Sequence, residues 1–161
     1  MKVDGKHFHT IWVHTDDNSI VQTIDQRWLP HKFIVEDLTT VQEAATAIKD
    51  MHVRGAPLIG VTAAYGMYLA GLSASQETPE KFMHIIDEAA ELLRSSRPTA
   101  VNLFWALDRQ TNGIKSIDGD VADMIDFLLQ TAGDIAAEEL ESCRLIGEHG
   151  LGLIESISQD K

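Results

Sequence analysis

Residues 58–70 are apolar on nearly every side of a helical wheel, and this run restricts the possible folds more than any other feature of the chain. A helix on a protein surface keeps one polar face, whereas a helix that is apolar all round must be covered on every side. Pro57 suits the first position of such a helix, and Gly71 is the kind of residue that ends one. The run therefore predicts a buried helix at the centre of a helical bundle.

Amphipathic helical patterns flank this run on both sides. Thr40 and Glu43 have the spacing of a capping box, in which each side chain hydrogen-bonds to the backbone N–H of the other residue. Apolar residues then recur at helical spacing as far as Met51, and similar patterns follow Thr78 and the break at Ser95–Thr99. The predicted helices cover residues 41–51, 57–71, 79–94 and 99–113, with a long one from about Asp118 onward.

The N-terminal residues have the composition of strands. Phe8–Thr15 and Ile20–Ile24 are rich in Ile, Val, Thr, Trp and Phe, and the turn-forming run Asp16–Ser19 separates them. Phe33–Leu38 is expected to form a third short strand. The predicted class is α+β, mostly helical, with a small antiparallel sheet, a helical bundle and a long last helix. We expect one domain over residues 1–115 and a long helix over 116–161.

The charge balance limits the kinds of ligand. Lys and Arg number 13 and Asp and Glu 25, which gives a net charge of −12. Such a chain is poorly suited to nucleic acid or to an anionic membrane surface, and no run of apolar residues is long enough to predict a membrane span. One cysteine and no apolar N-terminal segment predict a cytoplasmic protein. An acidic chain can still bind a phosphorylated metabolite where a few cations converge.

Two loops each place an arginine just before a predicted helix. In Arg54-Gly55-Ala56-Pro57 the small residues let the backbone approach a ligand, and the helix start offers unpaired N–H groups to an anion. Arginine adds a planar, charged fork that suits phosphate or neighbouring hydroxyls. The loop Ser96-Arg97-Pro98-Thr99 repeats this arrangement. On physical grounds alone, an ordinary surface turn and an ordinary helix cap stay open as alternatives.

Both loops lie inside longer runs, Val53–Gly60 and Ser96–Arg109, and a third run, Cys143–Gly150, follows near the end of the long helix. In sequence and order these runs resemble the N-terminal half of the methylthioribose-1-phosphate isomerase family, and the resemblance covers essentially the whole chain. The wider superfamily includes ribose-1,5-bisphosphate isomerases and regulatory subunits of a translation-initiation exchange factor. The second run favours the methylthioribose branch.

The resemblance implies a role for the two loops. It makes Arg54, Gly55 and Ala56 one substrate-binding segment and Arg97 a further contact with a sugar phosphate. The implied reaction converts the aldose 5-methylthioribose 1-phosphate to the ketose 5-methylthioribulose 1-phosphate in methionine salvage, with no metal or organic cofactor. Because the phosphate on C1 blocks spontaneous ring opening, the reaction calls for a positioned acid or base in a site closed to water.

The resemblance also implies that the catalytic residues lie beyond Lys161. The family's cysteine, in a Thr-x-Cys-Asn-x-Gly setting, and its aspartate belong to a Rossmann-like C-terminal domain that this sequence does not include. Cys143 is expected to be a small, partly buried helix residue, because its place in mid-helix offers no helix N-terminus to stabilise a thiolate. We therefore expect an N-terminal fragment that is inactive alone.

Two other readings stay open at this point. The chain resembles the exchange-factor subunits enough to be a non-catalytic sugar-phosphate-binding or regulatory module, and the ribose-1,5-bisphosphate isomerase branch is a further alternative. The apolar stripe of the long helix is expected to pack on the missing C-terminal half or on another chain. A homo-oligomer is compatible with that expectation.

The histidines and tryptophans carry weaker signals. His7 and His9 could share one face of a strand, but no third ligand follows at a spacing that suits zinc, so no metal site is expected. His52 is expected to help hold the loop that carries Arg54. The tryptophans are expected to lie in the core or between domains, and they are Trp12, Trp28 and Trp105.

Overall fold

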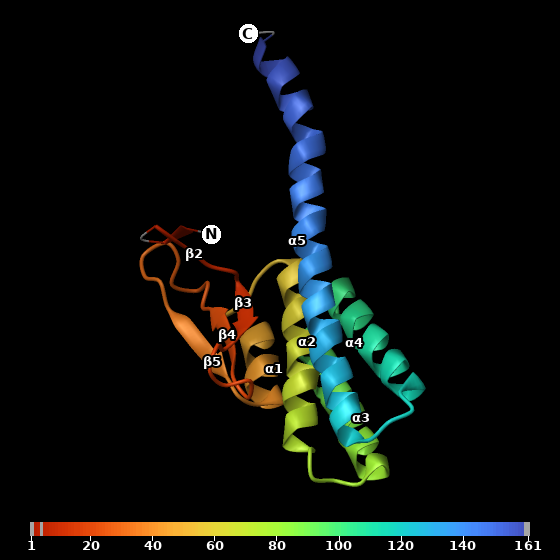
Figure 1. The fold of residues 1–161 in the computed structure, drawn as a ribbon. Helices are drawn as coiled ribbons and strands as arrows, with labels where there is room; N and C mark the ends of the chain where they lie inside the picture. The colour runs from red at the N-terminus through yellow and green to blue at the C-terminus, as the bar shows by residue number, and fades with distance from the viewer. Residues whose placement is uncertain (1, 4, 160–161) are drawn as a thin grey trace.

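The computed structural model describes residues 2–3 and 5–159, which form a small β-layer beside a helical bundle from which one long helix projects (Figure 1). The strands are β1 (Lys2–Val3), β2 (Lys6–His7), β3 (Ile11–Val13), β4 (Val21–Ile24) and β5 (Val35–Leu38). The helices are α1 (Val41–Lys49), α2 (Ala56–Ser73), α3 (Pro79–Ser96), α4 (Val101–Gly113), a 3-10 turn (Ile114–Ser116) and α5 (Val121–Gln159). The predicted class and order of elements are confirmed.

The predicted antiparallel sheet has the order β3-β4-β5, with Trp12 opposite Gln22 and Gln22 opposite Asp37. In the turn between β3 and β4, Asp17 accepts hydrogen bonds from the hydroxyl and backbone N–H of Ser19. These bonds hold the pKa of Asp17 below its ordinary value. The strand expected over Phe8–Thr15 is limited to β3, and the β1–β2 hairpin was not predicted because strands of two residues carry no pattern.

The capping box at the start of α1 is confirmed in both directions. The Thr40 hydroxyl accepts the backbone N–H of Glu43 at 3.2 Å, and the Glu43 carboxylate accepts the backbone N–H of Thr40 at 3.1 Å. The carboxylate also accepts the N–H of Thr39 at 2.7 Å. This cap fixes the direction in which the chain leaves the sheet and enters the bundle, so the apolar face of α1 packs on α2.

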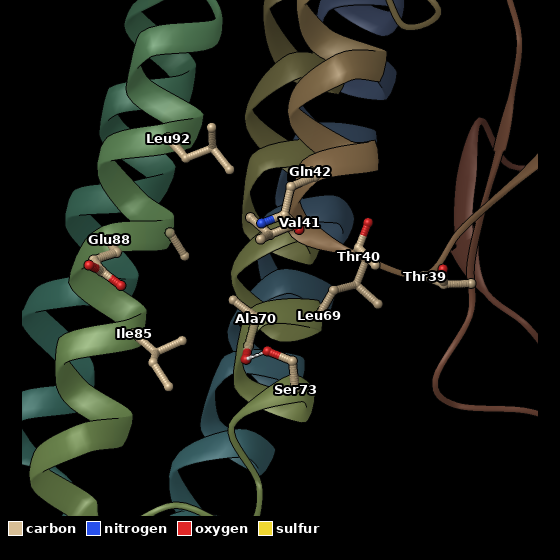
Figure 2. Close-up of a pocket in the computed structure, with 11 residues that line it drawn as sticks. Thr39, Thr40, Val41, Gln42, Leu69, Ala70, Ser73, Ile85, Glu88 and Leu92 are labelled. Atoms are coloured by element: carbon tan, nitrogen blue, oxygen red, sulfur yellow. Dashed lines mark hydrogen bonds between the residues drawn. The ribbon is translucent and has the colours of Figure 1, made fainter.

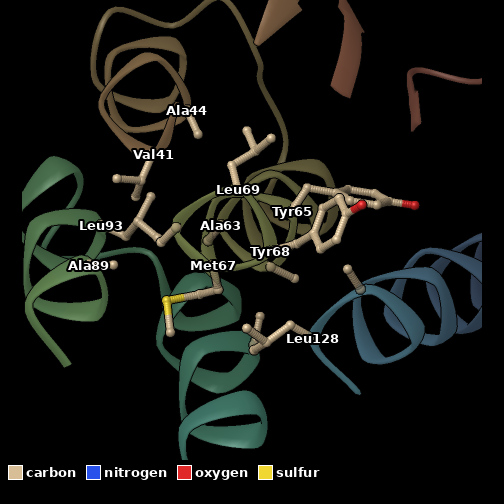
Figure 3. Packing of buried hydrophobic residues seen from close by; sticks show 14 of the residues in the cluster. Val41, Ala44, Ala63, Tyr65, Met67, Tyr68, Leu69, Ala89, Leu93 and Leu128 are labelled. Atoms are coloured by element: carbon tan, nitrogen blue, oxygen red, sulfur yellow. The ribbon is translucent and has the colours of Figure 1, made fainter. Parts of the chain in front are cut away.

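Helix α2 is the centre of the bundle, as the apolar run predicts. Every residue from Leu58 to Gly71 is buried, because α1, α3, α4 and α5 all pack around it (Figure 3). Met67 of α2 lies among side chains from its neighbours, such as Leu93 of α3 and Leu128 of α5 (Figure 3). The length and mean hydropathy of α2 would suffice to cross a membrane, but 72% of the helix is buried inside the bundle. It is a core helix.

The predicted ends of α2 need two corrections. The helix begins at Ala56, one residue before Pro57, and Gly71 does not end it, since it continues to Ser73. Gly71 lies where α5 crosses: a Cβ there would meet Leu128 Cδ1 at 2.9 Å. The glycine is therefore explained by close helix packing and not by a helix terminus.

Helix α5 has a buried half and an exposed half. Its first turns pack on α2, so the expectation that its apolar stripe lacks a partner in this chain is wrong for these turns. Beyond Leu140 the helix leaves the bundle, and Ile146 and Leu153 are 73% and 69% exposed. Covering of that second half by another domain or chain stays a prediction, as does the boundary between residues 115 and 116. The buried residues of the first half are Met124, Ile125, Leu128, Ala132 and Ile135.

Two of the three tryptophans are not in the core. Trp28 and Trp105 are each 45% exposed, whereas Trp12 is half-buried and donates a hydrogen bond to Gln22. The guanidinium of Arg109 lies over the Trp105 ring, 5.4 Å from its centroid. An aromatic residue in a sequence indicates a side chain that packs against an apolar surface. The sequence pattern does not say whether that surface belongs to the same chain or to another domain or protein.

Candidate functional site

The first predicted loop joins α1 to α2 and carries Arg54 on the surface. Gly55 has φ +90° and stands at the N-cap of α2, a conformation that L side chains rarely adopt. Among the described residues no side chain caps α2, so the N–H groups of its first turn, apart from Pro57 which has none, remain available to an anion. Arg54 reaches back only to the carbonyl of Met51, at 3.4 Å.

The second predicted loop joins α3 to α4. Arg97 is the C-cap of α3 with φ −153° and ψ 82°, and its carbonyl accepts the backbone N–H of Ala100 at 3.1 Å. The N-cap of α4 is Ala100, which has no side-chain hydrogen bond to the helix. The alternative in which the loop Ser96–Thr99 is an ordinary helix cap is therefore not observed among the described residues, and this helix start is also uncapped.

The two uncapped helix starts lie together. Helices α2 and α4 begin at the same end of the bundle, beside the middle of α5 (Figure 1). In their first turns the backbones nearly touch, because a Cβ on Gly60 would lie 2.8 Å from the carbonyl oxygen of Asn102. The fold thus brings the loop of Arg54 and the loop of Arg97 to one end of the molecule, although the two arginines are 43 positions apart in sequence.

Arg54 and Arg97 differ from the other arginines in their partners. Among the described residues, neither of the two forms an ion pair with a carboxylate, in a chain whose acidic residues outnumber its basic ones. The remaining arginines all have such a partner: Arg27 with Asp25, Arg94 with Glu91 and Asp108, Arg109 with Glu138, and Arg144 with Glu141 and Glu148. Two guanidinium groups are therefore left without a carboxylate partner at this end of the bundle, and each still has N–H donors to offer a ligand.

Helix α5 closes one side of this end through polar contacts with α4. Asn102 donates to Glu139 at 3.2 Å, and Arg109 holds Glu138 with two hydrogen bonds of 2.6 and 2.8 Å. These bonds keep the pKa of Glu138 below its ordinary value. A hollow of about 260 Å³ lies between α2, α5 and the segment before β3. Its lining includes Phe8, Pro57, Leu58, Val61, Glu139 and Leu140.

Cys143 also borders this hollow, and it is exposed. The expectation that it is partly buried is wrong for this chain, because α5 has left the bundle at that point. Its mid-helix position is as predicted, so the N-terminus of its own helix is far from the thiol.

A cluster that sequence reasoning missed lies behind the Arg54 loop. One ligand atom each from Asp25, Glu36 and His52 lies within 4.8 Å of the others, a spacing that could hold a metal ion. However, both oxygens of Asp25 accept hydrogen bonds from Arg27, at 2.7 to 3.2 Å, and His52 Nδ1 lies 2.7 Å from Glu36 Oε2. Because the guanidinium already supplies the positive charge, the arrangement fits an ion-pair cluster better than a cation site. The pairing of His52 agrees with its expected role in holding the loop.

A second hollow, of about 300 Å³, lies between α1, α2 and α3 (Figure 2). Its floor is apolar, with Leu69, Ala70 and Leu92, and its rim carries Thr40 and Glu88. The lining includes no arginine, lysine or histidine, so it offers no positive charge to a phosphate group. The two arginine loops therefore form the better candidate for an anion.

Known proteins match this chain over most or all of its length. The methylthioribose-1-phosphate isomerase of Sinorhizobium medicae is 44% identical over 161 residues, and that of Desulfosudis oleivorans is 45% identical over 151 residues. The chain covers 100% and 94% of its own length in these matches but only 42% and 40% of the relatives. It thus spans less than half the length of these curated relatives.

Two solved structures share the fold. The 5-methylthioribose 1-phosphate isomerase from Pyrococcus horikoshii matches with a TM-score of 0.74 and 39% identity, over 80% of this chain and 36% of that one. Translation initiation factor eIF-2B, subunit delta, from A. fulgidus matches with a TM-score of 0.82 and 33% identity, over 91% of this chain and 42% of that one.

The family model that matches this chain describes the Initiation factor 2 subunit family and covers residues 52–159. This range contains both arginine loops, the core helix α2 and the whole of α5. It amounts to well over half of the chain. The chain belongs to the Initiation factor 2 subunit family.

Proposed function

We propose that this chain supplies the substrate-holding part of an S-methyl-5-thioribose-1-phosphate isomerase, which converts an aldose 1-phosphate to the ketose 1-phosphate in methionine salvage. The observation that carries the proposal is the pair of arginines that, among the described residues, lack carboxylate partners, at two uncapped helix starts that the fold brings together. The names of relatives at 44% identity over the whole chain support the same substrate.

Each proposed contact has a distinct chemical task. Arg54 and Arg97 are charged forks that suit the phosphate and the sugar hydroxyls, and Gly55 and Ala56 let the backbone N–H groups at the start of α2 approach the ligand. A hydrogen bond to a charged group contributes about 1.5–3 kcal/mol. Loss of one arginine is therefore expected to weaken binding by at least about tenfold.

Isomerisation itself calls for further groups. Opening the ring and moving hydrogen between C2 and C1 needs an acid or base in a site closed to water. Since the chain spans about 42% of its curated relatives, we propose that these groups come from the part of the protein that those relatives have in addition, or from another chain. The chain alone then binds a sugar phosphate without turnover, in the cytoplasm, with no cofactor.

Calorimetry with 5-methylthioribose 1-phosphate tests the binding role. Arg97→Ala and Arg54→Ala are each expected to lower the affinity by at least about tenfold. Arg144→Ala is the matched control, because it also removes one exposed guanidinium but lies on the projecting half of α5 and pairs with Glu141. An affinity for the sugar phosphate that is unchanged in Arg97→Ala would count against the proposed site.

A second candidate is a non-catalytic sugar-phosphate-binding or regulatory module, which the match to translation initiation factor eIF-2B, subunit delta, favours. It predicts binding but no isomerisation even when the remaining part of an isomerase is added. Titration with ribose 1,5-bisphosphate distinguishes the third alternative. Tighter binding of the bisphosphate than of the methylthio sugar would favour the ribose-1,5-bisphosphate isomerase branch.

A further inference from the structure

The loop that carries Arg54 contains one residue, Met51, in a backbone conformation that its side chain disfavours. Met51 has φ +62°, in the left-handed region that costs a side chain of this kind about 1–2 kcal/mol, and Gly55 has φ +90°. Two reversals of this kind within five residues fix the direction of the intervening chain. Because a residue in a disfavoured conformation persists only where its surroundings hold it, contacts from outside the loop are needed to keep Met51, and the chain that leads from it to Arg54, in place.

Those outside contacts converge on His52, whose side chain is only 9% exposed. Its Nδ1 lies 2.7 Å from the carboxylate of Glu36 on β5, and its carbonyl accepts the backbone N–H of Gln26 at 2.8 Å. Val53, the next residue, is fully buried in the core. Val53, just before Arg54, is thus fixed by the core, and His52 is fixed by the β-layer.

We infer that Glu36 and His52 position Arg54: the Glu36–His52 pair fixes the substrate-binding loop relative to the sheet. The inference rests on the proposed function for the role of Arg54 in binding. It makes Glu36 and His52 positioning residues, since neither needs to touch the sugar phosphate. The small sheet then contributes to the site, because Glu36 belongs to β5, which pairs with β4 and precedes α1 in the chain.

The charges around His52 support a specific pairing. Asp25 and Glu36 both face the imidazole, but the oxygens of Asp25 are already held by Arg27. That pairing keeps the pKa of Asp25 below its ordinary value. Glu36 is therefore the carboxylate that is available to His52, and removal of its side chain leaves a buried imidazole nitrogen without its partner.

The experiment compares Glu36→Ala with Glu36→Gln and with Asp37→Ala. The amide oxygen of glutamine can still accept a hydrogen bond from the imidazole, so Glu36→Gln is the conservative rescue. Asp37 is the next residue of β5 and accepts a hydrogen bond from Gln22. Asp37→Ala therefore removes one carboxylate and one hydrogen bond from the same strand without removing the partner of His52. Two readouts are measured: the affinity for 5-methylthioribose 1-phosphate and the NMR order parameters of the Arg54 and Gly55 amides.

Glu36→Ala is expected to lower the affinity by about fivefold to tenfold and the two order parameters from about 0.85 to below about 0.6. Glu36→Gln and Asp37→Ala are expected to retain the affinity within about twofold and both order parameters near about 0.85. If the original chain does not bind the sugar phosphate, the proposed function fails, and the order parameters alone decide the positioning role. Rigid Arg54 and Gly55 amides in Glu36→Ala, or equal loosening in Asp37→Ala, would overturn it.

Discussion

Glycine is required at three positions in α2 and its N-cap, for two different structural reasons. Gly55 is required by its backbone conformation, because φ +90° is strained for any residue with a Cβ. Gly60 and Gly71 have ordinary helical conformations and are required by their neighbours, since a Cβ at either position would lie within 3 Å of α4 or α5. At the residue scale, then, the joining of the two arginine loops depends on the missing side chain of Gly60.

Gly60→Ala tests this dependence. The added methyl group would lie 2.8 Å from the carbonyl oxygen of Asn102, a backbone atom that cannot move without shifting the start of α4. We expect a loss of about 1–3 kcal/mol in the free energy of unfolding, measured by urea denaturation, and weaker binding of the sugar phosphate.

Gly133→Ala is the matched control in α5. Nothing lies within 4 Å of the added Cβ, so the substitution is expected to stabilise the chain by about 0.5–1 kcal/mol through helix propensity alone. Equal changes in the two variants would show that Gly60 is not a contact point.

Glu43 makes the stability of the chain depend on pH. Its carboxylate accepts the N–H of Thr39 and further bonds from Thr39 and Thr40, and these bonds outweigh partial burial and hold its pKa below the ordinary value of 4.5. A carboxylate with a lowered folded-state pKa stabilises the fold above its unfolded-state value and loses that contribution as the pH falls through the folded-state value.

The variant Glu43→Gln keeps a capping side chain but cannot titrate. The difference in urea midpoint between the original chain and Glu43→Gln is therefore expected to be larger at about pH 6 than at about pH 3.5. The control Asp87→Asn removes an exposed carboxylate of α3 and is expected to leave the midpoint nearly unchanged at both pH values. A difference for Glu43→Gln that does not shrink in acid would contradict this account.

At the scale of elements, α5 combines a core helix with a projecting one. Leu128 is fully buried against Gly71, whereas Leu153, about seven turns later, is 69% exposed. The sequence has one continuous apolar pattern over both halves, so only the structure distinguishes them.

Matched leucine substitutions separate the two halves of α5. Leu128→Ala is expected to lower the free energy of unfolding by about 2–5 kcal/mol, because it leaves a cavity between α2 and α5. Leu153→Ala is expected to change it by less than about 0.5 kcal/mol. Both values come from urea denaturation of the chain alone. A large loss for Leu153→Ala would mean that the projecting half is covered in solution.

The elements that could be predicted from sequence are those whose cause is local. The apolar run of α2 and the capping box of α1 each specify a helix within a few residues, and both are confirmed. The role of Gly71 and the exposure of Trp105 depend on packing between segments distant in sequence. No local pattern contains that information.

The candidate site divides in the same way. An arginine before a helix start is visible in the sequence, so Arg54 and Arg97 could be named without a structure. The close approach of the two helix starts depends on Gly60, and the proposed positioning of Arg54 through His52 depends on Glu36, which belongs to the sheet. A strand carboxylate and a loop histidine give no joint signal in sequence, because their spacing is set by tertiary structure.

At the scale of the whole molecule, binding of a phosphorylated sugar has to overcome a net charge of −12. Within the part of the chain that the structure describes, the fold pairs most arginines with carboxylates and leaves two without such a partner, at the end of the bundle from which α5 projects (Figure 1). The central claim is that these two arginines and the two helix starts form one binding site.

The measurement that tests this claim most directly is an NMR titration of the chain with 5-methylthioribose 1-phosphate. We predict that the amide signals of Gly55 and Ala56 shift together with those of Arg97 and Val101, along a single binding isotherm, while the signals around the hollow between α1, α2 and α3 stay in place. Shifts confined to that hollow, or two separate isotherms for the two loops, would contradict the account.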